Sequence, residues 1–128
     1  MDNWNHYEKY FLQDEFACKC GSCGSLEEMD EHFISKLFDL RERINRPLVI
    51  TSGFRCSLHP QAFRPSGQSS THHLGIAADI RATNGGERYQ IVKHAIAMNF
   101  QGVGVAKSFV HVDLASDLDY PRPVIWTY

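Results

Sequence analysis

The sequence contains no apolar run that approaches the ~20 residues needed to span a membrane as a helix. It also has no excess of positive charge. Its 13 basic and 15 acidic side chains give a formal net charge of −2, which argues against nucleic acid as a partner. The polar first residues lack the apolar segment of a signal peptide. We therefore expect a protein without a membrane span that is made in the cytoplasm and stays there unless another factor releases it.

Internal repeats and low-complexity stretches are also missing, so nothing in the pattern divides the chain. Of the 128 residues, 43% are hydrophobic and 22% are charged, which is the ordinary range for a globular domain. Length and composition thus predict one domain over residues 1–128, long enough to bury a hydrophobic core.

Two segments have the periodicity of helices. A capping-box signature at Ser25–Glu28 precedes the first, which is predicted over residues 26–44 and ends before Pro47. A turn at residues 84–86 precedes the second, which is predicted over residues 87–98. The apolar stripe of the first helix consists of Phe33, Leu37, Leu40 and Ile44, and that of the second consists of Tyr89, Val92 and Ile96.

Four short segments have the composition of strands. They lie at residues 48–51, 76–80, 102–106 and 108–114, and the last two are predicted to form a hairpin. We expect the tail, residues 121–126, to add an edge strand or to place its tryptophan along the rim of a cleft.

Candidate metal ligands lie in two segments, residues 70–79 and 109–113. The first offers His72 and Asp79, and the second offers His111. Imidazole nitrogen and carboxylate oxygen are the ligands of catalytic zinc sites, in which three protein groups leave one position open for water. We therefore predict a zinc site at these three residues.

The spacing of His72 and Asp79 restricts how such a site can form. In a helix the two residues would lie about 10 Å apart along the axis, and in an extended chain they would lie more than ~20 Å apart. Each ligand must instead come within ~2.0–2.2 Å of one ion. The chain must therefore reverse between them, and we predict a turn at residues 73–75 in which Gly75 allows the reversal.

The later segment alternates as a strand, so His111 and Asp113 share one face. Two roles are open for Asp113. It can act as the general base beside the metal, or it can accept a hydrogen bond that orients a ligand imidazole.

The stretch from Ser70 to Asp79 has the pattern SxHxxGxAxD, and FVHVD follows at residues 109–113. This combination resembles the zinc DD-peptidases, which include D-alanyl-D-alanine carboxypeptidases and phage L-alanyl-D-glutamate endopeptidases and share their fold with the hedgehog signalling domain. Residues 51–55, TSGFR, look like the SG(Y/F)R segment of that family, and the resemblance spans roughly residues 10–126.

The resemblance implies an α+β fold, with two main helices packed on a small, mostly antiparallel sheet. It implies one catalytic zinc ion, held by His72, Asp79 and His111. It also places Arg55 and Ser70 in the substrate-binding site, where Arg55 would bind carbonyl or carboxylate oxygens. The activity that the resemblance implies is hydrolysis of an amide bond in peptidoglycan stem peptides. The protein would act as a carboxypeptidase or as an endopeptidase.

Proton transfer is less directly implied, because Ser108 stands where several family members carry an acidic general base. The role then passes to Asp113, which would accept the proton of the attacking water while zinc and Arg55 stabilise the oxyanion. His73 lacks the family spacing, and we expect it to be a neighbour that forms hydrogen bonds near His72.

The small, single-domain chain fits a phage lysis enzyme (endolysin) that degrades the cell wall, and we expect a monomer. The alternative is a non-catalytic zinc-binding module of the same fold with a structural or partner-binding role.

Four cysteines remain: Cys18, Cys20 and Cys23 in one loop, and Cys56 directly after Arg55. They can form two disulfides, bind a structural zinc ion or stay as buried thiols. Because CxCxxC is not the spacing of a zinc ribbon and the cytoplasm is reducing, free thiols are our expectation. If Cys56 joins the others, the N-terminal loop is tied next to Arg55.

Overall fold

Five strands form one sheet in the order β1-β2-β4-β3-β5 in the computed structural model, which describes residues 4–128. The pairs β1–β2, β2–β4 and β3–β4 are antiparallel, and only β5 runs parallel to its neighbour β3. The predicted hairpin is present as β3 and β4, and the tail forms an edge strand as expected. The strands are β1 (Ile50–Ser52), β2 (Ala77–Arg81), β3 (Gly102–Val105), β4 (Phe109–Asp113) and β5 (Val124–Thr127).

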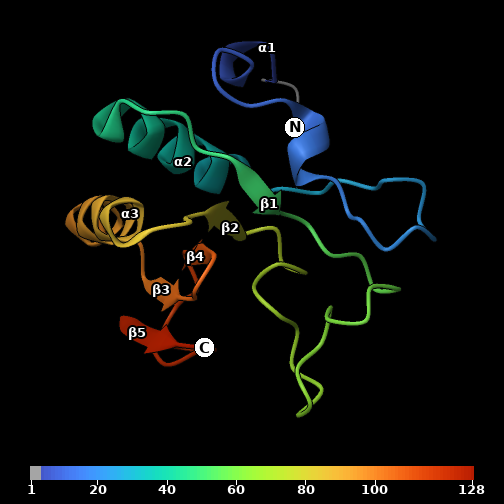
Figure 1. The fold of residues 1–128 in the computed structure, drawn as a ribbon. Helices are drawn as coiled ribbons and strands as arrows, with labels where there is room; N and C mark the ends of the chain where they lie inside the picture. Colours follow the sequence, from blue (N-terminus) through green and yellow to red (C-terminus); the bar gives the residue numbers. More distant parts are fainter. Residues whose placement is uncertain (1–3) are drawn as a thin grey trace.

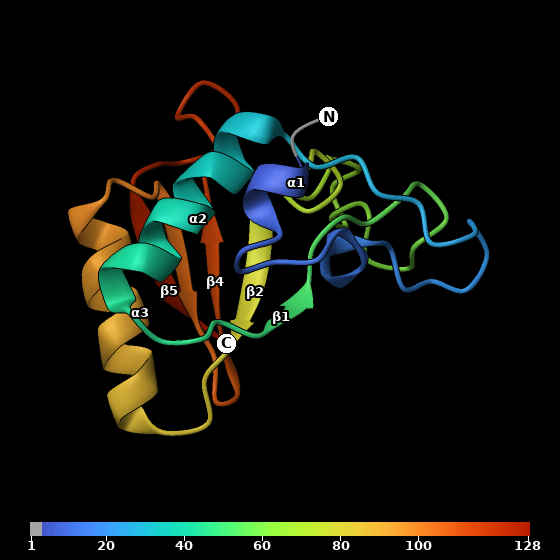
Figure 2. The same ribbon diagram turned by 90° about the horizontal axis from the view of Figure 1, so that it is seen from above.

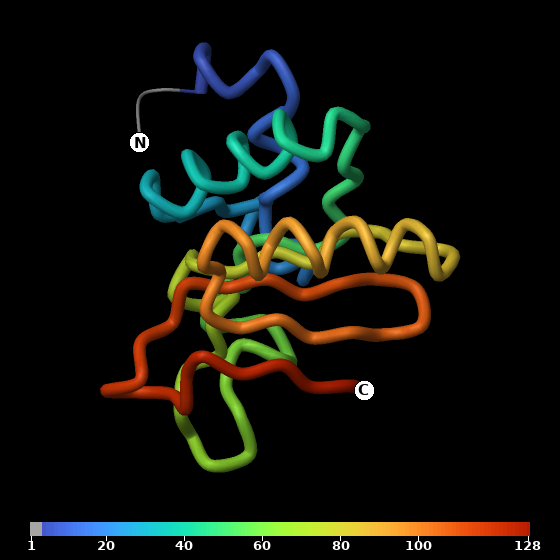
Figure 3. The backbone as a smooth tube through the Cα atoms, turned by 90° about the vertical axis from the view of Figure 1, so that its left-hand side faces the viewer, coloured from blue at the N-terminus to red at the C-terminus, as the bar shows by residue number. Residues whose placement is uncertain are grey.

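Two long helices, α2 (Glu31–Ile44) and α3 (Gly85–Ala97), lie on the same side of the sheet (Figure 1 and Figure 2). The short α1 (Trp4–Tyr7) and the 3-10 helix η1 (Gln13–Phe16) precede them. Seen from the side, the long connection between β1 and β2 extends away from α2 and α3 (Figure 3). The predicted α+β class, with two main helices on a mostly antiparallel sheet, is therefore confirmed. Within residues 4–128, no helix combines the length and apolar character needed to cross a bilayer.

Side-chain caps begin both main helices, but at other residues than predicted. The carboxylate of Asp30 accepts a hydrogen bond from Phe33 N (3.0 Å), and the amide oxygen of Asn84 accepts one from Glu87 N (2.9 Å). The capping box predicted at Ser25–Glu28 is wrong, because those residues form a loop that is held to other loops by backbone hydrogen bonds. The second helix begins earlier than predicted. Residues 84–86, where we expected a turn, are its N-cap and its first two residues.

The stripe predicted for the second helix is correct only in part. Val92 packs against the core, but Tyr89 is 63% exposed and Ile96 is 54% exposed. Ile91 and Ala95 are buried instead. The buried face of α3 is therefore rotated from the predicted one. The stripe of α2 does pack into the core, which is formed largely by Phe33, Ile34, Leu37, Leu40, Ile80, Val110 and Val112.

Candidate metal centre

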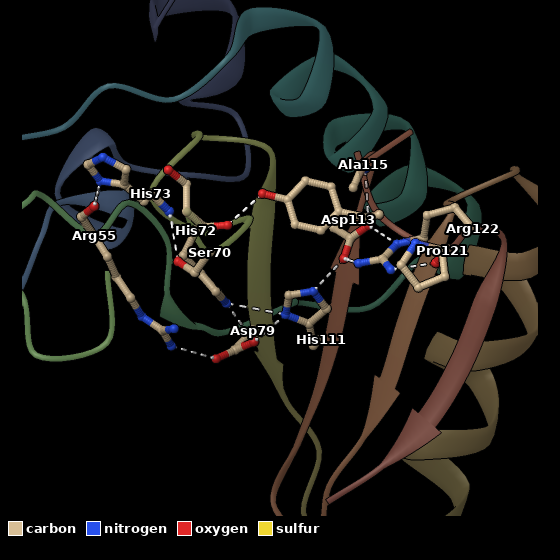
Figure 4. Close-up of polar contacts among 12 residues, drawn as sticks. Arg55, Ser70, His72, His73, Asp79, His111, Asp113, Ala115, Pro121 and Arg122 are labelled. Carbon is tan, nitrogen blue, oxygen red and sulfur yellow. Dashed lines mark hydrogen bonds and ion pairs between the residues drawn. The ribbon is translucent and has the colours of Figure 1, made fainter. Parts of the chain in front are cut away.

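Three side chains converge above the middle of the sheet (Figure 4). Asp79 on β2 and His111 on β4 are register partners, and His72 enters from the turn that precedes β2. His72 Nε2 lies 3.3 Å from Asp79 Oδ1, and His111 Nδ1 lies 3.2 Å from each of these atoms. A tetrahedral zinc ion with bonds of ~2.0–2.1 Å separates its ligand atoms by about 3.3 Å. The three atoms thus have the spacing of one face of such a site.

Gly75 makes the turn that delivers His72. Its φ is +73°, and a Cβ at this position would collide with the backbone oxygen of Glu28, so no other residue fits. The turn is closed by a hydrogen bond from Gly75 N to the backbone oxygen of His72 (3.2 Å). The predicted reversal at residues 73–75 is confirmed, and it returns the chain to the sheet in time for Asp79 to face His72.

Hydrogen-bond partners fix the protons of both imidazoles. His72 Nδ1 lies 2.8 Å from Gly53 O, and because a carbonyl only accepts, Nδ1 carries the hydrogen and Nε2 keeps its lone pair. His111 Nε2 lies 2.8 Å from Asp113 Oδ2, so in the neutral ring Nδ1 keeps its lone pair. When both rings are neutral, two lone pairs and the carboxylate of Asp79 therefore face one another. When His111 is protonated, its Nδ1 donates to Asp79 instead. A bound cation satisfies all three acceptors at once.

Gly53 is placed to support His72 by close packing at the end of β1. A Cβ on Gly53 would lie 2.7 Å from Phe16 Cα, so only glycine lets this backbone pass against η1. Phe54 N also donates to Phe16 O (2.8 Å). The local sequence SGFR thus orients the carbonyl that accepts from His72.

Asp113 is fully buried on the side of His111 away from Asp79. Besides His111, its carboxylate accepts hydrogen bonds from Ala115 N (3.1 Å), Arg122 Nε (3.0 Å) and Arg122 Nη2 (2.8 Å). Gly102 on β3 leaves the space, since a Cβ there would overlap this carboxylate. Burial raises the pKa of Asp113, but the hydrogen bonds from His111 and Arg122 outweigh it and hold the pKa at about 2.

The two imidazoles differ in basicity because their partners differ. Burial lowers the pKa of His72. Burial also acts to lower the pKa of His111, but hydrogen bonds to Asp113 and Asp79 favour its charged ring, and its pKa is raised. The pKa of Asp79 is lowered, because hydrogen bonds from His111 and His72 outweigh the opposite effect of burial.

Arg55 lies beside the converging atoms, with Nη2 3.6 Å from Asp79 Oδ2. Burial lowers the pKa of its guanidinium. Its Nε is buried, and none of the described residues accepts a hydrogen bond from it. Arg55 also lines the cleft that holds the candidate metal position.

Ser70 and His73 hold the turn around His72. Ser70 Oγ accepts a hydrogen bond from His73 N (3.1 Å), and the ring nitrogen His73 Nδ1 lies 2.8 Å from the backbone oxygen of Arg55. The prediction that His73 forms hydrogen bonds nearby is confirmed. Ser70 also lines the cleft, and its contact with substrate stays a prediction.

A cleft of about 900 Å³ opens over the three acceptors. The ring of Trp126 lies at the edge of this cleft, and its centroid is 5.1 Å from that of His111. This agrees with the expectation that the tail could place its tryptophan along the rim. Arg122 also lines the cleft, with its guanidinium carbon 5.3 Å from the Trp126 ring centroid. Sequence reasoning missed Arg122, because its only local signal is a basic residue between two prolines. Of the described residues that line the cleft, Asp79 is the only carboxylate.

The fold is an α+β domain in which three side chains that could hold a metal ion converge at an open cleft, the arrangement that metallopeptidases use. The family model described as Peptidase M15 matches residues 9–113. The chain therefore belongs to the M15 family of zinc DD-peptidases, which confirms the resemblance seen in the sequence. Comparison with curated proteins and with solved structures gives no significant match.

Proposed function

We propose that the protein is a zinc-dependent hydrolase of peptidoglycan stem peptides, either a D-Ala-D-Ala carboxypeptidase or an L-Ala-D-Glu endopeptidase. The observation that carries this proposal is the convergence of three possible metal-ligand atoms, on His72, Asp79 and His111, at the floor of an open cleft. These residues would hold one zinc ion. When bound, zinc supplies a Lewis acid that activates water and polarises the scissile carbonyl.

Arg55 lines the cleft beside the proposed ion, so its guanidinium is placed to bind a substrate oxygen there. Its Nη2 lies 3.6 Å from Asp79 Oδ2, and its buried Nε has no acceptor among the described residues. A guanidinium held this way stabilises the charge that develops on a carbonyl oxygen during hydrolysis. It can equally bind a substrate carboxylate through two parallel hydrogen bonds.

The sequence left two roles open for Asp113, general base or acceptor that orients a ligand imidazole. We assign it the orienting role. Its carboxylate contacts the ring nitrogen of His111 that points away from Asp79, and Arg122 and Ala115 occupy its remaining acceptor positions. The ring of His111 separates it from the ion position. A carboxylate in this place fixes the tautomer of His111 and strengthens it as a ligand.

The charge of the cleft favours an anionic peptide. Arg55, Arg64 and Arg122 line it, against a single lining carboxylate, Asp79. Asp79 itself would be neutralised by a bound cation, and Arg122 is paired with Asp113. Arg55 and Arg64 would therefore leave the walls basic. Stem peptides carry a terminal carboxylate and the carboxylate of a glutamate, and both complement such walls.

Digestion of purified peptidoglycan by the zinc-loaded protein tests the proposal. Mass spectrometry of the products distinguishes loss of a terminal D-Ala from a cut that leaves L-Ala on the sugar. His72→Ala, which lacks one zinc ligand, is the inactive control. Intact stem peptides after treatment with protein of proven zinc content would instead support the non-catalytic zinc-binding module. Lysis of cells from outside is a separate assay, which addresses the endolysin role.

A further inference from the structure

A second cluster of metal-ligating side chains lies where the loop after η1 meets the segment after β1. It consists of the chain's four cysteines, Cys18, Cys20, Cys23 and Cys56. Their Sγ atoms all lie within 4.8 Å of one another, and each is a free thiol in the described structure. None of them lines the cleft above the sheet.

The spacing of the sulfurs fits one shared ion. A tetrahedral zinc ion with Zn–S bonds of ~2.3 Å separates its sulfurs by roughly 3.8 Å. The distance from Cys20 Sγ to Cys56 Sγ is 3.5 Å, and no pair in the cluster exceeds 4.8 Å. Two disulfides need only closeness within each pair, so mutual convergence of all four sulfurs is the feature that indicates a metal site.

Backbone amides point at three of the sulfurs. Such bonds stabilise the charged thiolate that binds a metal, as hydrogen bonds around ligands do in metal sites generally. The donors are Ser22 N to Cys20 Sγ (3.4 Å), Leu26 N to Cys23 Sγ (3.4 Å) and Cys56 N to Cys18 Sγ (3.3 Å).

Glycines follow Cys20 and Cys23 and allow this geometry. Gly21 has φ +79° and Gly24 has φ +71°, in the left-handed region that side chains disfavour. Neither would meet another atom within 4 Å if it carried a Cβ, so the backbone conformation, and not crowding, explains these glycines. The CGSCG sequence therefore folds as two tight turns that aim amides at the sulfurs.

We infer that Cys18, Cys20, Cys23 and Cys56 bind a structural zinc ion, separate from the ion proposed at the cleft. Four protein ligands leave no position for water or substrate, which is the property of a structural site. Cys18 and Cys56 are buried and the other two are partly exposed, so the ion has a path of entry. The cysteines are free of disulfides, as expected, and the inference adds a metal ion to them.

This ion would stabilise the backbone segment next to the cleft. It joins the N-terminal loop to Cys56, which directly follows Arg55. The same segment contains Gly53, whose carbonyl accepts from His72. Loss of the ion would therefore loosen the segment that positions both Arg55 and His72.

Zinc content of protein purified under reducing conditions tests the inference. We expect two zinc ions per chain in the wild type, one in His72→Ala and one in the double variant Cys20→Ser/Cys23→Ser. Ser22→Ala is the matched control and keeps two, since Ser22 contributes only its backbone amide. One zinc in the wild type together with none in His72→Ala would overturn the second site.

Cobalt substitution in His72→Ala gives a test that does not depend on the folding of the cysteine variant. Thiolate ligands give cobalt a near-ultraviolet charge-transfer band, and the chain has no sulfur ligand set besides these four cysteines. We expect this band, and its absence would overturn the inference. Freshly purified protein whose mass shows two disulfides would also overturn it. Either result would overturn only the cysteine site and would leave the proposed peptidase activity at the cleft standing. The two proposals are therefore tested separately.

Discussion

At the scale of single residues, the candidate site depends on where two imidazoles keep their protons. Gly53 O fixes the hydrogen of His72 on Nδ1, and Asp113 fixes that of His111 on Nε2. The partner of His72 is a neutral carbonyl and that of His111 is a charged carboxylate, so the pKa values of the two rings differ. Because the pKa of His111 is raised and that of His72 is lowered, His111 is the ligand at which protons compete with a metal.

The pH dependence of zinc binding follows from His111. Its raised pKa means that in the metal-free protein the ring is protonated at pH values where a free histidine, with a pKa of ~6.5, is neutral. Zinc must displace this proton, so affinity falls as pH decreases through the raised pKa of His111. Chelator competition at a series of pH values measures this fall. An affinity that is constant from neutral pH down to about pH 5 contradicts the assignment of His111 as a ligand.

Asp113→Asn distinguishes an orienting residue from a general base. If Asp113 orients His111, zinc affinity falls ~10–100-fold, while kcat at saturating zinc changes little. If it is the base, zinc affinity is kept and kcat falls by ~10²–10⁴. Asp117→Asn, at an exposed carboxylate in the next loop, is the control. Thermal unfolding checks that Arg122, which loses its partner, has not destabilised the fold.

Arg55→Lys tests the substrate contact. Lysine keeps the charge but loses the planar set of donors, so kcat/KM should fall by about 10²–10³, the cost of losing one oxyanion donor. Zinc content should be unchanged, because Arg55 is not a ligand. Arg81→Lys, at the exposed end of β2, is the matched control. Equal activity of the two variants would exclude Arg55 from the reaction.

The three candidate ligands that the structure brings together could be selected from the sequence because each lies in a short pattern with a physical meaning. His72 and Asp79 are related by a glycine turn, and the alternation of β4 fixes the face of His111. Arg122 has no such pattern. Its place beside Asp113 depends on a loop and on the path of β5, which local periodicity does not specify.

At the scale of elements, errors arose where local signals competed with tertiary packing. The signature at Ser25–Glu28 satisfies the rule for a helix start, yet Asp30 caps α2, because Asp30 N donates to Gly75 O (2.9 Å) in a distant turn. In α3, Ile91 and Ala95 are buried, whereas the predicted Tyr89 and Ile96 are exposed. The strands were easier to predict, since period-two alternation is decided within a few residues.

Gly75→Ala tests the turn that joins these elements. Gly67→Ala is the matched control, because Gly67 also has positive φ, +90°, but would meet nothing within 4 Å. The control should lose about 1 kcal/mol or slightly more of the free energy of unfolding, from backbone strain alone. Gly75→Ala adds a collision with Glu28 O and should lose more, together with zinc affinity. Denaturant titration measures both, and equal losses would show that the collision is relieved without cost.

At the scale of the whole molecule, two regions of different construction meet at the sheet. On one side, α2 and α3 lie over the sheet (Figure 2), and their apolar side chains share one core with those of β2, β3 and β4. On the other, residues 53–76 contain little regular structure and are held by polar contacts around the candidate site. Stability in the second region therefore depends on the ion more than stability in the first.

Zinc should consequently protect the two regions unequally. A ligand at 100 times its Kd stabilises the folded state by about 2.7 kcal/mol, and here the gain should be concentrated around the three groups that the ion would join. Hydrogen exchange read by mass spectrometry should show slower exchange in residues 53–76 on zinc addition, with residues 33–40 of α2 little changed. His72→Ala is the control, since zinc held by the cysteines acts on both proteins and only the wild type gains the ion at the cleft. Equal protection of both regions in the wild type would mean that the ion stabilises the sheet core directly, and that residues 53–76 do not depend on the site.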